Sequence, residues 1–280
     1  MINHNIREPK DKEISECINV LYSAFGRVPS MTIKKEAKVW KSLIKNEIGK
    51  FLISELKGKI IGIGGIFLFK GICSFGYMGV LPEYRGMGVG AEIFNELFEI
   101  GKDLNYQTMV LYASKLGKPI YKKFGFQGSF FGTMYNLPIQ IPELNVEIKQ
   151  IKVLNIFPDW ALILDKKAMG FDRSKYLQVR INLGAKILAI ENEGYGLISN
   201  LRLGPLIATN LDAALQIINK SITLGANHLI IAEHQQLQKK IFESIKLTKH
   251  ENQGSLKMTY GKIISERLDL LYAISTYAKG

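Results

Sequence analysis

The sequence predicts two successive domains of the α/β (α+β) class, each a twisted mixed β-sheet flanked by helices. Three observations lead to this prediction. Segments typical of strands and helices alternate twice along the chain, which is the pattern of layered α/β folds. A proline-containing stretch, LPIQIPEL at 137–144, separates the two halves, and proline interrupts regular structure. The length of 280 residues suits two domains of ordinary size.

Helices are expected where apolar residues recur at helical spacing, and strands where apolar residues alternate or run together. The expected elements of the first half are helices 14–25, 37–48, 89–100 and 119–124, and strands 51–56, 60–69, 72–80 and 108–113, with further strand structure to about 137. Lys57-Gly58 is expected to form a hairpin turn, and Gly49 and Gly101 to end helices. Residues 1–140 form the first predicted domain.

The second half repeats this order of elements. Its expected elements are helices 157–169, 174–183, 211–224 and 236–245, and strands 187–190, 196–201, 206–208 and 229–232. When Met109 is aligned with Ile230, apolar positions agree through the following strand and helix, but Tyr121 falls on Phe242. Residues 143–280 are therefore predicted to be a second domain of the same plan that has lost the chemistry of the first.

The stretch YMGVLPEYRGMGVGAEIF, residues 77–94, carries the main functional signal. Gly86, Gly88 and Gly90 alternate between an expected strand and an expected helix. Glycine is unfavourable there unless the backbone must approach something closely. Successive amide groups at a helix N-terminus bind anions, and Arg85 would add positive charge. This segment is therefore predicted to bind phosphate groups.

Other readings of the glycines are weaker. A Walker loop requires Gly-x4-Gly-Lys-Ser/Thr, which this sequence lacks. The dinucleotide pattern Gly-x-Gly-x-x-Gly/Ala matches through Ala91, but the acidic Asp103 precedes the next strand instead of following it. A glycine-rich turn without a ligand would not require three alternating glycines.

The segments VLPEYRGMGVG and PIYKKFGF resemble the two cofactor segments of the GNAT superfamily of N-acetyltransferases. The resemblance covers residues 1 to about 140. It implies a fold in which the glycine loop opens the long central helix, and acetyl-coenzyme A (acetyl-CoA) as cofactor. It also implies that the pyrophosphate binds the backbone at Gly86, Met87, Gly88, Val89 and Gly90.

The same resemblance assigns further residues. Backbone groups of Met78, Gly79 and Val80 would hold pantetheine and the thioester carbonyl, and Tyr121 would protonate the coenzyme A sulfur. The alternative for Tyr121 is a packed aromatic side chain. Where many family members carry Asn, Ser114 is the nearest candidate for a pantetheine contact. No general base is evident in the strand 72–80, which contains no Asp or Glu.

The second half resembles the C-terminal domain of tandem GNAT proteins with a Gly-aromatic-Asp-Arg segment, here GFDRSKYL, followed by LGPLIA and a closing YAISTYAKG. This resemblance suggests that Asp172 and Arg173 meet the acceptor substrate. The alternative is local, because Asp172 could cap the helix that follows it. The second domain is expected to shape the acceptor site and to bind no cofactor.

Composition limits the remaining possibilities. The net charge of +12 comes from 37 basic and 25 acidic residues without a Lys/Arg block, which makes nucleic-acid binding the weaker reading. Two cysteines and a polar N-terminal stretch favour a reducing cytoplasm, and no apolar run is long enough for a membrane span. The four histidines show no metal-binding spacing, so no metal is expected.

The predicted function is acetyl-CoA-dependent transfer of an acetyl group to a primary amine by direct attack on the thioester. The alternative is a sensor that binds acyl-coenzyme A without turnover. The sequence leaves open whether the amine belongs to a small molecule or a protein, and whether the chain is a monomer or a homodimer.

Overall fold

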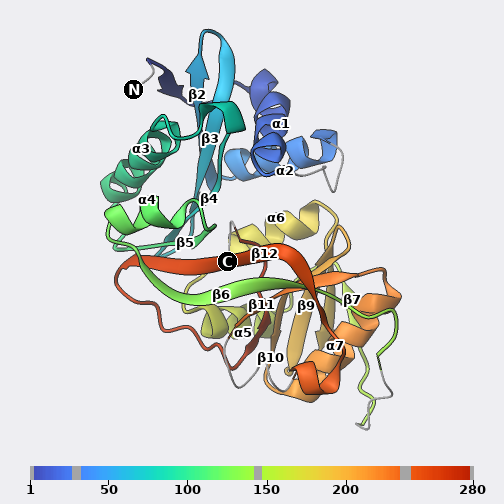
Figure 1. The fold of residues 1–280 in the computed structure, drawn as a ribbon. Helices are drawn as coiled ribbons and strands as arrows, with labels where there is room; N and C mark the ends of the chain where they lie inside the picture. Colours follow the sequence, from blue (N-terminus) through green and yellow to red (C-terminus); the bar gives the residue numbers. More distant parts are fainter. Residues whose placement is uncertain (1–2, 27–32, 142–146, 234–240, 278–280) are drawn as a thin grey trace. The chain divides into compact units, whose positions relative to one another are not determined.

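The computed structural model describes residues 3–26, 33–141, 147–233 and 241–277 (Figure 1). The chain divides into two compact units, Met1–Leu111 and Tyr112–Ala278, called here the first and second units. The division falls well before the boundary predicted near Pro138, because the strand β6 (Gln127–Asn136) pairs with strands β11 and β12 of the second unit. The division into residues 1–140 and 143–280, placed at the proline-containing stretch, stays a prediction, and Pro142 lies outside the described residues.

The first unit is a five-stranded mixed sheet with helices on both faces. Its elements are β1 (Asn5–Arg7), η1 (Asp11–Glu13), α1 (Ile14–Ala24), α2 (Ile33–Lys45), β2 (Gly49–Leu56), β3 (Lys59–Leu68), β4 (Cys73–Val80), η2 (Pro82–Tyr84), α3 (Val89–Asp103) and β5 (Thr108–Ala113), whose last residues belong to the second unit. The strand order is β1-β2-β3-β4-β5. Neighbouring strands from β1 to β4 are antiparallel. Strands β4 and β5 are parallel, and helix α3 forms the crossover between them.

Most predicted elements of the first half are confirmed, with two corrections. Gly49 begins β2 and does not end a helix, because α2 already stops at Lys45. Gly101 lies inside α3 and is buried against Met109, where a side chain would be crowded. The hairpin turn is confirmed, since Lys57 and Gly58 both have positive φ, which the tight turn requires.

The glycines of β3 allow α3 to pack closely on the sheet. A Cβ atom on Gly64 would lie 2.5 Å from Met78 Sδ and 2.8 Å from Ile93 Cγ2, so a larger residue would push the helix away. On the other face, α1 approaches Gly79 through Ala24 and Leu21. Figure 1 shows α1 and α2 on one side of β2–β4 and α3 on the other. This packing fixes the position of the β4–α3 connection, which contains the glycines.

The second unit contains a larger mixed sheet. Its remaining elements are α4 (Lys118–Lys123), β7 (Lys152–Leu154), α5 (Asp159–Met169), α6 (Ser174–Asn182), β8 (Lys186–Ile190), β9 (Gly194–Ser199), β10 (Arg202–Ala208), α7 (Leu211–Thr223), β11 (His228–Ala232), β12 (Thr248–Gly261) and β13 (Leu271–Ala273). The strand order is β12-β6-β11-β10-β9-β8-β7, and β13 pairs with β10. Residues 241–244 are helical, and the start of the helix predicted at 236 lies outside the described residues.

Successive residues of β9 point to opposite faces of this sheet. Tyr195 donates a hydrogen bond to Asp165 of α5, whereas a side chain at Gly196 would collide with Ile217 of α7. The sheet is therefore covered on both faces, and α7 contributes the fully buried Ile217 and Ile218 to an apolar core that it shares with β8–β11. The alternation of strands and helices predicted for this half is confirmed, whereas β12 and β13 were not predicted.

Within the described parts of the chain, no helix has the length and apolar character needed to cross a membrane. In the same residues, no group of three or more His, Cys, Asp or Glu side chains could hold a metal ion. Cys17 and Cys73 are buried free thiols.

Candidate functional site

The connection between β4 and α3 is an exposed turn whose shape depends on glycine. Gly86 and Gly88 adopt left-handed backbone conformations, with φ of 76° and 92°. A Cβ atom on Gly86 would meet nothing within 4 Å. Residues 85–88 are all exposed. The glycines therefore serve the backbone path and leave the outer side of the turn open.

The amide groups of this turn have no hydrogen-bond acceptor among the described residues. Among the described residues, none of the five amides from Gly86 to Gly90 donates a hydrogen bond to another backbone or side-chain group. The first amides to enter the helix are those of Ala91 and Glu92, which both donate to Gly88 O, at 2.9 and 3.0 Å. Free amides at the positive end of a 15-residue helix form a site suited to an anion such as pyrophosphate.

The side chain of Arg85 ties this turn to the rest of the first unit. Its Nε donates to Val80 O at 3.2 Å, and its Nη2 donates to Ala24 O at the end of α1. These bonds hold the turn against the last residue of β4. Arg85 therefore positions the loop, in addition to bringing the positive charge that the sequence suggested.

The strand β4 is irregular immediately before this turn. It pairs with β5 only from Cys73↔Met109 to Phe75↔Leu111. On its other side, the register with β3 shifts between Ile63↔Gly79 and Gly65↔Gly76, which leaves an extra residue on β4. Tyr77 lies in this bulge with a positive φ of 57°. Met78, Gly79 and Val80 thus lie beyond the last β4–β5 pair, on the segment that leads into the turn.

Two further predicted residues, Ser114 and Tyr121, lie together at α4 in the second unit. Ser114 Oγ accepts a 3.2 Å hydrogen bond from Gly117 N, and its carbonyl accepts from Lys118 N, so Ser114 shapes the start of the helix. Tyr121 is 7% exposed and packs against Gly117, where a Cβ atom would lie 3.3 Å from the tyrosine hydroxyl. Burial raises the pKa of Tyr121 well above its usual value, so the hydroxyl remains protonated at neutral pH.

Comparison with known proteins decides the family. The model of an acetyltransferase (GNAT) domain matches residues 47–128, and a second model with the same description matches residues 161–273. A proposed acetyltransferase from Pyrococcus horikoshii, known from its crystal structure, is 31% identical in sequence to this chain. The two structures superpose with a TM-score of 0.91, and the match covers 100% of this chain and 97% of that one.

The chain belongs to the GNAT acetyltransferase family. It is also 29% identical to the uncharacterized N-acetyltransferase YitH of Bacillus subtilis, over 83% of this chain and 86% of that protein. A tandem GNAT protein from the clavulanic acid biosynthesis pathway shares the fold, with a TM-score of 0.61 and 11% identity over 92% of this chain and 98% of its own. GNAT domains use acetyl-CoA, which is therefore the cofactor of this family member.

The second GNAT unit has a capped helix start at the place equivalent to the glycine turn. Its helix α7 follows β10 just as α3 follows β4, but its N-cap is Asn210. The Asn210 side chain accepts a 2.8 Å hydrogen bond from Ala213 N. One of the amides that an anion would need is therefore already satisfied by the protein.

In the second GNAT unit, the C-terminal segment lies between the strands β10 and β11 where these two strands separate. The parallel strands β10 and β11 pair only at Arg202↔His228 and Leu203↔Leu229, and then separate. Strand β13 pairs with β10 beyond this point. Ala208 N donates to Leu270 O at 3.0 Å, and Ile274 N donates to Ile230 O at 2.8 Å. Nothing in the sequence patterns indicated this insertion, since β13 is only three residues long.

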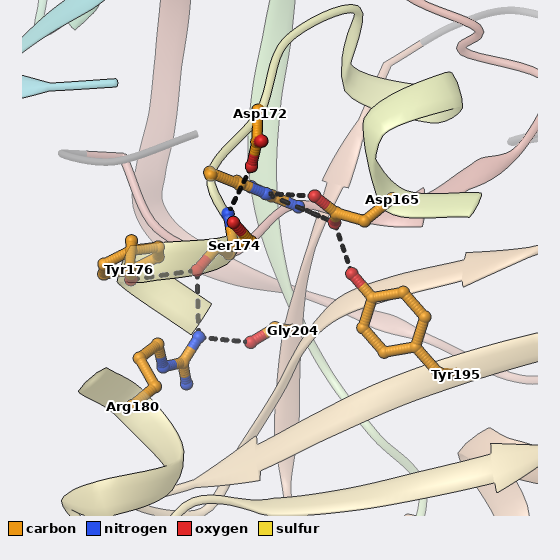
Figure 2. Close-up of polar contacts among 9 residues, drawn as sticks. Asp165, Asp172, Ser174, Tyr176, Arg180, Tyr195 and Gly204 are labelled. Atoms are coloured by element: carbon orange, nitrogen blue, oxygen red, sulfur yellow. Dashed lines mark hydrogen bonds and ion pairs between the residues drawn. The ribbon is translucent and has the colours of Figure 1, made fainter. Parts of the chain in front are cut away.

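Asp172 and Arg173 have local partners in the second GNAT unit, and Figure 2 shows Asp172 beside Ser174 and Asp165 beside Tyr195. Asp172 Oδ1 accepts a 2.9 Å hydrogen bond from the backbone N of Ser174, the first residue of α6, and the N-cap residue of this helix is Arg173. Arg173 is 1% exposed and forms an ion pair with Asp165, with 2.8 Å between Nη2 and Oδ1. Asp165 also accepts from Tyr195. Arg173 is thus part of a buried ion pair, and its predicted contact with substrate stays a prediction.

A neighbouring set of polar groups secures the C-terminal segment. Arg180 Nη1 donates to Gly204 O at 2.8 Å and to Ser275 Oγ at 2.9 Å, and Tyr176 OH lies 3.2 Å from Ser275 Oγ (Figure 2). Ser275 is completely buried. Helix α6, strand β10 and the residues after β13 are thus joined by hydrogen bonds among buried or half-buried groups, which are costly to leave unpaired.

Proposed function

We propose that this chain is an acetyl-CoA-dependent N-acetyltransferase that acetylates a primary amine, with catalysis in residues 1–140. The observation that carries the proposal is the set of unpartnered amides from Gly86 to Gly90 at the N-terminus of α3. They suit the pyrophosphate of the cofactor, and the exposed glycines give it room. We place the enzyme in the cytoplasm, in keeping with its two free thiols.

The residues of the first unit have distinct roles in this proposal. The amides of Gly86, Met87, Gly88, Val89 and Gly90 hold the pyrophosphate, and Arg85 keeps their turn in place. Backbone groups of Met78, Gly79 and Val80 hold the pantetheine arm and orient the thioester carbonyl. When bound, acetyl-CoA supplies an activated acetyl group that a neutral amine can attack.

Tyr121 is assigned the role of proton donor to the coenzyme A sulfur as it leaves. Its buried hydroxyl stays protonated at neutral pH, which is the state required of a proton donor. Ser114 supports the start of α4, the helix that carries Tyr121, and is kept as a candidate contact for pantetheine. Residues 143–280 are assigned no cofactor, because Asn210 caps α7 and the C-terminal segment fills the opening between β10 and β11.

Replacement of Gly88 by glutamate tests the cofactor site. Gly88→Glu would introduce a negative charge among the amides and should weaken coenzyme A binding at least tenfold, or about 1.4 kcal/mol, in calorimetry. The matched control is Gly58→Glu, which adds the same charge at another open glycine with positive φ, in the β2–β3 turn. If the two variants bound coenzyme A with equal affinity, the glycine turn would not be part of the cofactor site.

A non-catalytic acyl-coenzyme A sensor is the second candidate, and it is favoured by the lack of an acidic residue in β4. Release of free thiol from acetyl-CoA, measured with benzylamine, spermidine and kanamycin as acceptors, separates the two candidates. An enzyme releases thiol in proportion to amine acetylation. Tight binding of coenzyme A with no amine-dependent release would favour the sensor.

A further inference from the structure

An aromatic cluster lies beside the irregular part of β4 in the first unit. Trp40 of α2 stacks on Phe51 of β2, with ring centroids 4.3 Å apart. Tyr77 of β4 packs on Trp40 at 5.0 Å and meets Phe67 of β3 edge-on at 5.6 Å. Trp40, Phe51 and Phe67 are buried, whereas Tyr77 is half-buried. Tyr77 therefore forms the accessible edge of this cluster.

A single carboxylate is attached to the cluster. Glu36, in the first turn of α2, is half-buried, and its Oε1 accepts hydrogen bonds from Trp40 Nε1 at 3.2 Å and from Tyr77 OH at 3.5 Å. Among the described residues, no Lys, Arg or His forms an ion pair with Glu36, and its Oε2 accepts no hydrogen bond. The carboxylate is thus held in place while one of its oxygens stays available.

The helix alone does not account for this arrangement. A glutamate in the first turn of α2 is favourable for the helix dipole, and Trp40 is its neighbour one turn later. The contact with Tyr77 comes from another element, at the bulge of β4. A non-glycine residue with φ of 57° costs energy, and such conformations cluster at functional sites.

The bulge also relates Glu36 to the proposed reaction. Tyr77 directly precedes Met78, Gly79 and Val80, the segment assigned to the thioester carbonyl. A carboxylate beside an aromatic ring suits a primary ammonium group, which donates a charge-assisted hydrogen bond to the carboxylate and is attracted to the face of the ring. Most amines reach the enzyme in this charged form, because their pKa is near 10.

We infer that Glu36, fixed by Trp40 and Tyr77, binds the ammonium group of the acceptor and selects cationic acceptors over neutral ones. The inference rests on the proposed N-acetyltransferase function and adds to it the charge of the substrate and the residue that recognises it. Glu36 provides the anionic contact that the β4 sequence lacks.

Fluorescence titration tests this binding without any turnover. The sequence has two tryptophans, so Trp160→Phe leaves Trp40 as the reporter next to Glu36. In this background, benzylamine at pH 7 should change Trp40 emission in a saturable manner, whereas the neutral benzyl alcohol at the same concentration should not. Potassium chloride at equal ionic strength controls for screening.

Substitutions then assign the effect to the carboxylate. Glu36→Gln keeps an acceptor for Trp40 and should weaken benzylamine binding at least tenfold, and Glu36→Asp should recover part of it. The matched control is Glu16→Gln, an exposed acid on α1, which should bind like the parent. The inference would be overturned by an equal change in Trp40 emission with benzylamine and benzyl alcohol. Equal affinity of Glu36→Gln and Glu16→Gln for benzylamine would also overturn it.

Kinetics provide the second readout where turnover is measurable. Glu36→Gln should raise the KM for the amine at least tenfold and leave the KM for acetyl-CoA within twofold. A fall in kcat with both KM values unchanged would contradict charge selection. Because the fluorescence titration omits the cofactor, a chain that binds benzylamine through Glu36 but releases no thiol would refute the enzyme and keep the amine site.

Discussion

Ile274 N donates a 2.8 Å hydrogen bond to Ile230 O, which attaches the C-terminal segment to the strand β11. The same segment pairs with β10 through Leu271 and Ala273. The parallel strands of the second unit are therefore bridged by the chain itself at the point where they separate. In the first unit, the equivalent strand β4 continues past its last pair with β5 into the open glycine turn.

Gly204→Ala should loosen this C-terminal segment. A Cβ atom at Gly204 would overlap the carbonyl oxygen of Ile274, and backbone cannot move aside as a flexible side chain can. We expect a loss of about 1–3 kcal/mol in the free energy of unfolding, as for other overpacked sites. Urea unfolding measures it, with Gly254→Ala as control because its Cβ would make only an ordinary 3.5 Å contact. Equal stability of the two variants would contradict the close approach.

Arg173→Met should destabilise the second unit strongly. The substitution leaves the carboxylate of Asp165 buried without its cation, which typically costs about 3–5 kcal/mol. The control is Arg267→Met, which breaks an exposed ion pair with Asp269 and should cost less than about 1 kcal/mol. Urea unfolding of both variants gives the comparison. A loss as small as that of Arg267→Met would contradict the role of Arg173 as the partner that compensates the buried carboxylate of Asp165.

Tyr121→Phe should lower kcat at least tenfold and leave the KM for acetyl-CoA within twofold. The substitution removes only the hydroxyl, so the packing of the ring against Phe126 is kept. Thiol release at saturating amine measures kcat, and Tyr272→Phe is the control, as another buried tyrosine. If kcat were unaltered, Tyr121 would have a packing role only.

His228 should make the stability of the second unit depend on pH. Burial, together with the positive charges of Arg202 and His250, lowers the pKa of His228 from 6.5 to about 4. The unfolded chain therefore binds a proton first as the pH falls, and stability present above pH 6.5 is lost between pH 6.5 and 4. Because the ring is partly exposed, we expect the loss to be about 1 kcal/mol.

The variant His228→Gln isolates this contribution. Its free energy of unfolding should fall less than that of the parent between pH 7.5 and pH 4.5, with urea unfolding as the measurement. The difference between the two profiles reports His228 together with its interaction with Arg202 and His250. Parallel pH profiles for the two proteins would show that His228 titrates in the folded protein as it does in the unfolded chain.

Periodicity and turn chemistry were enough to predict most elements of both units. The helices α1, α3 and α7 carry apolar residues at helical spacing. The Lys57-Gly58 turn is recognisable because an apolar strand lies on each side of it. The two misplaced helix ends have a common cause. Gly49 and Gly101 are small because other groups pack against them, and a sequence does not distinguish a glycine that ends a helix from one that makes room.

The candidate cofactor turn was also predictable, because a phosphate site of this kind depends on neighbours in the sequence. Gly86, Gly88 and Gly90 lie within five residues, and the helix that follows them is strongly amphipathic. Local signals of this kind survive in the sequence, since the backbone groups that form the site are consecutive.

What the sequence determined by itself was therefore the tandem arrangement, the glycine turn and the family resemblance. The tertiary structure alone decided which polar residues meet. The family resemblance suggested that Arg173 meets substrate, and folding pairs this buried side chain with Asp165. Glu36 showed no signal, because it lies on helix α2 and its partner Tyr77 lies on strand β4. The three-residue β13 was hidden for the same reason, as hydrogen bonds between distant segments leave no periodic trace in the chain.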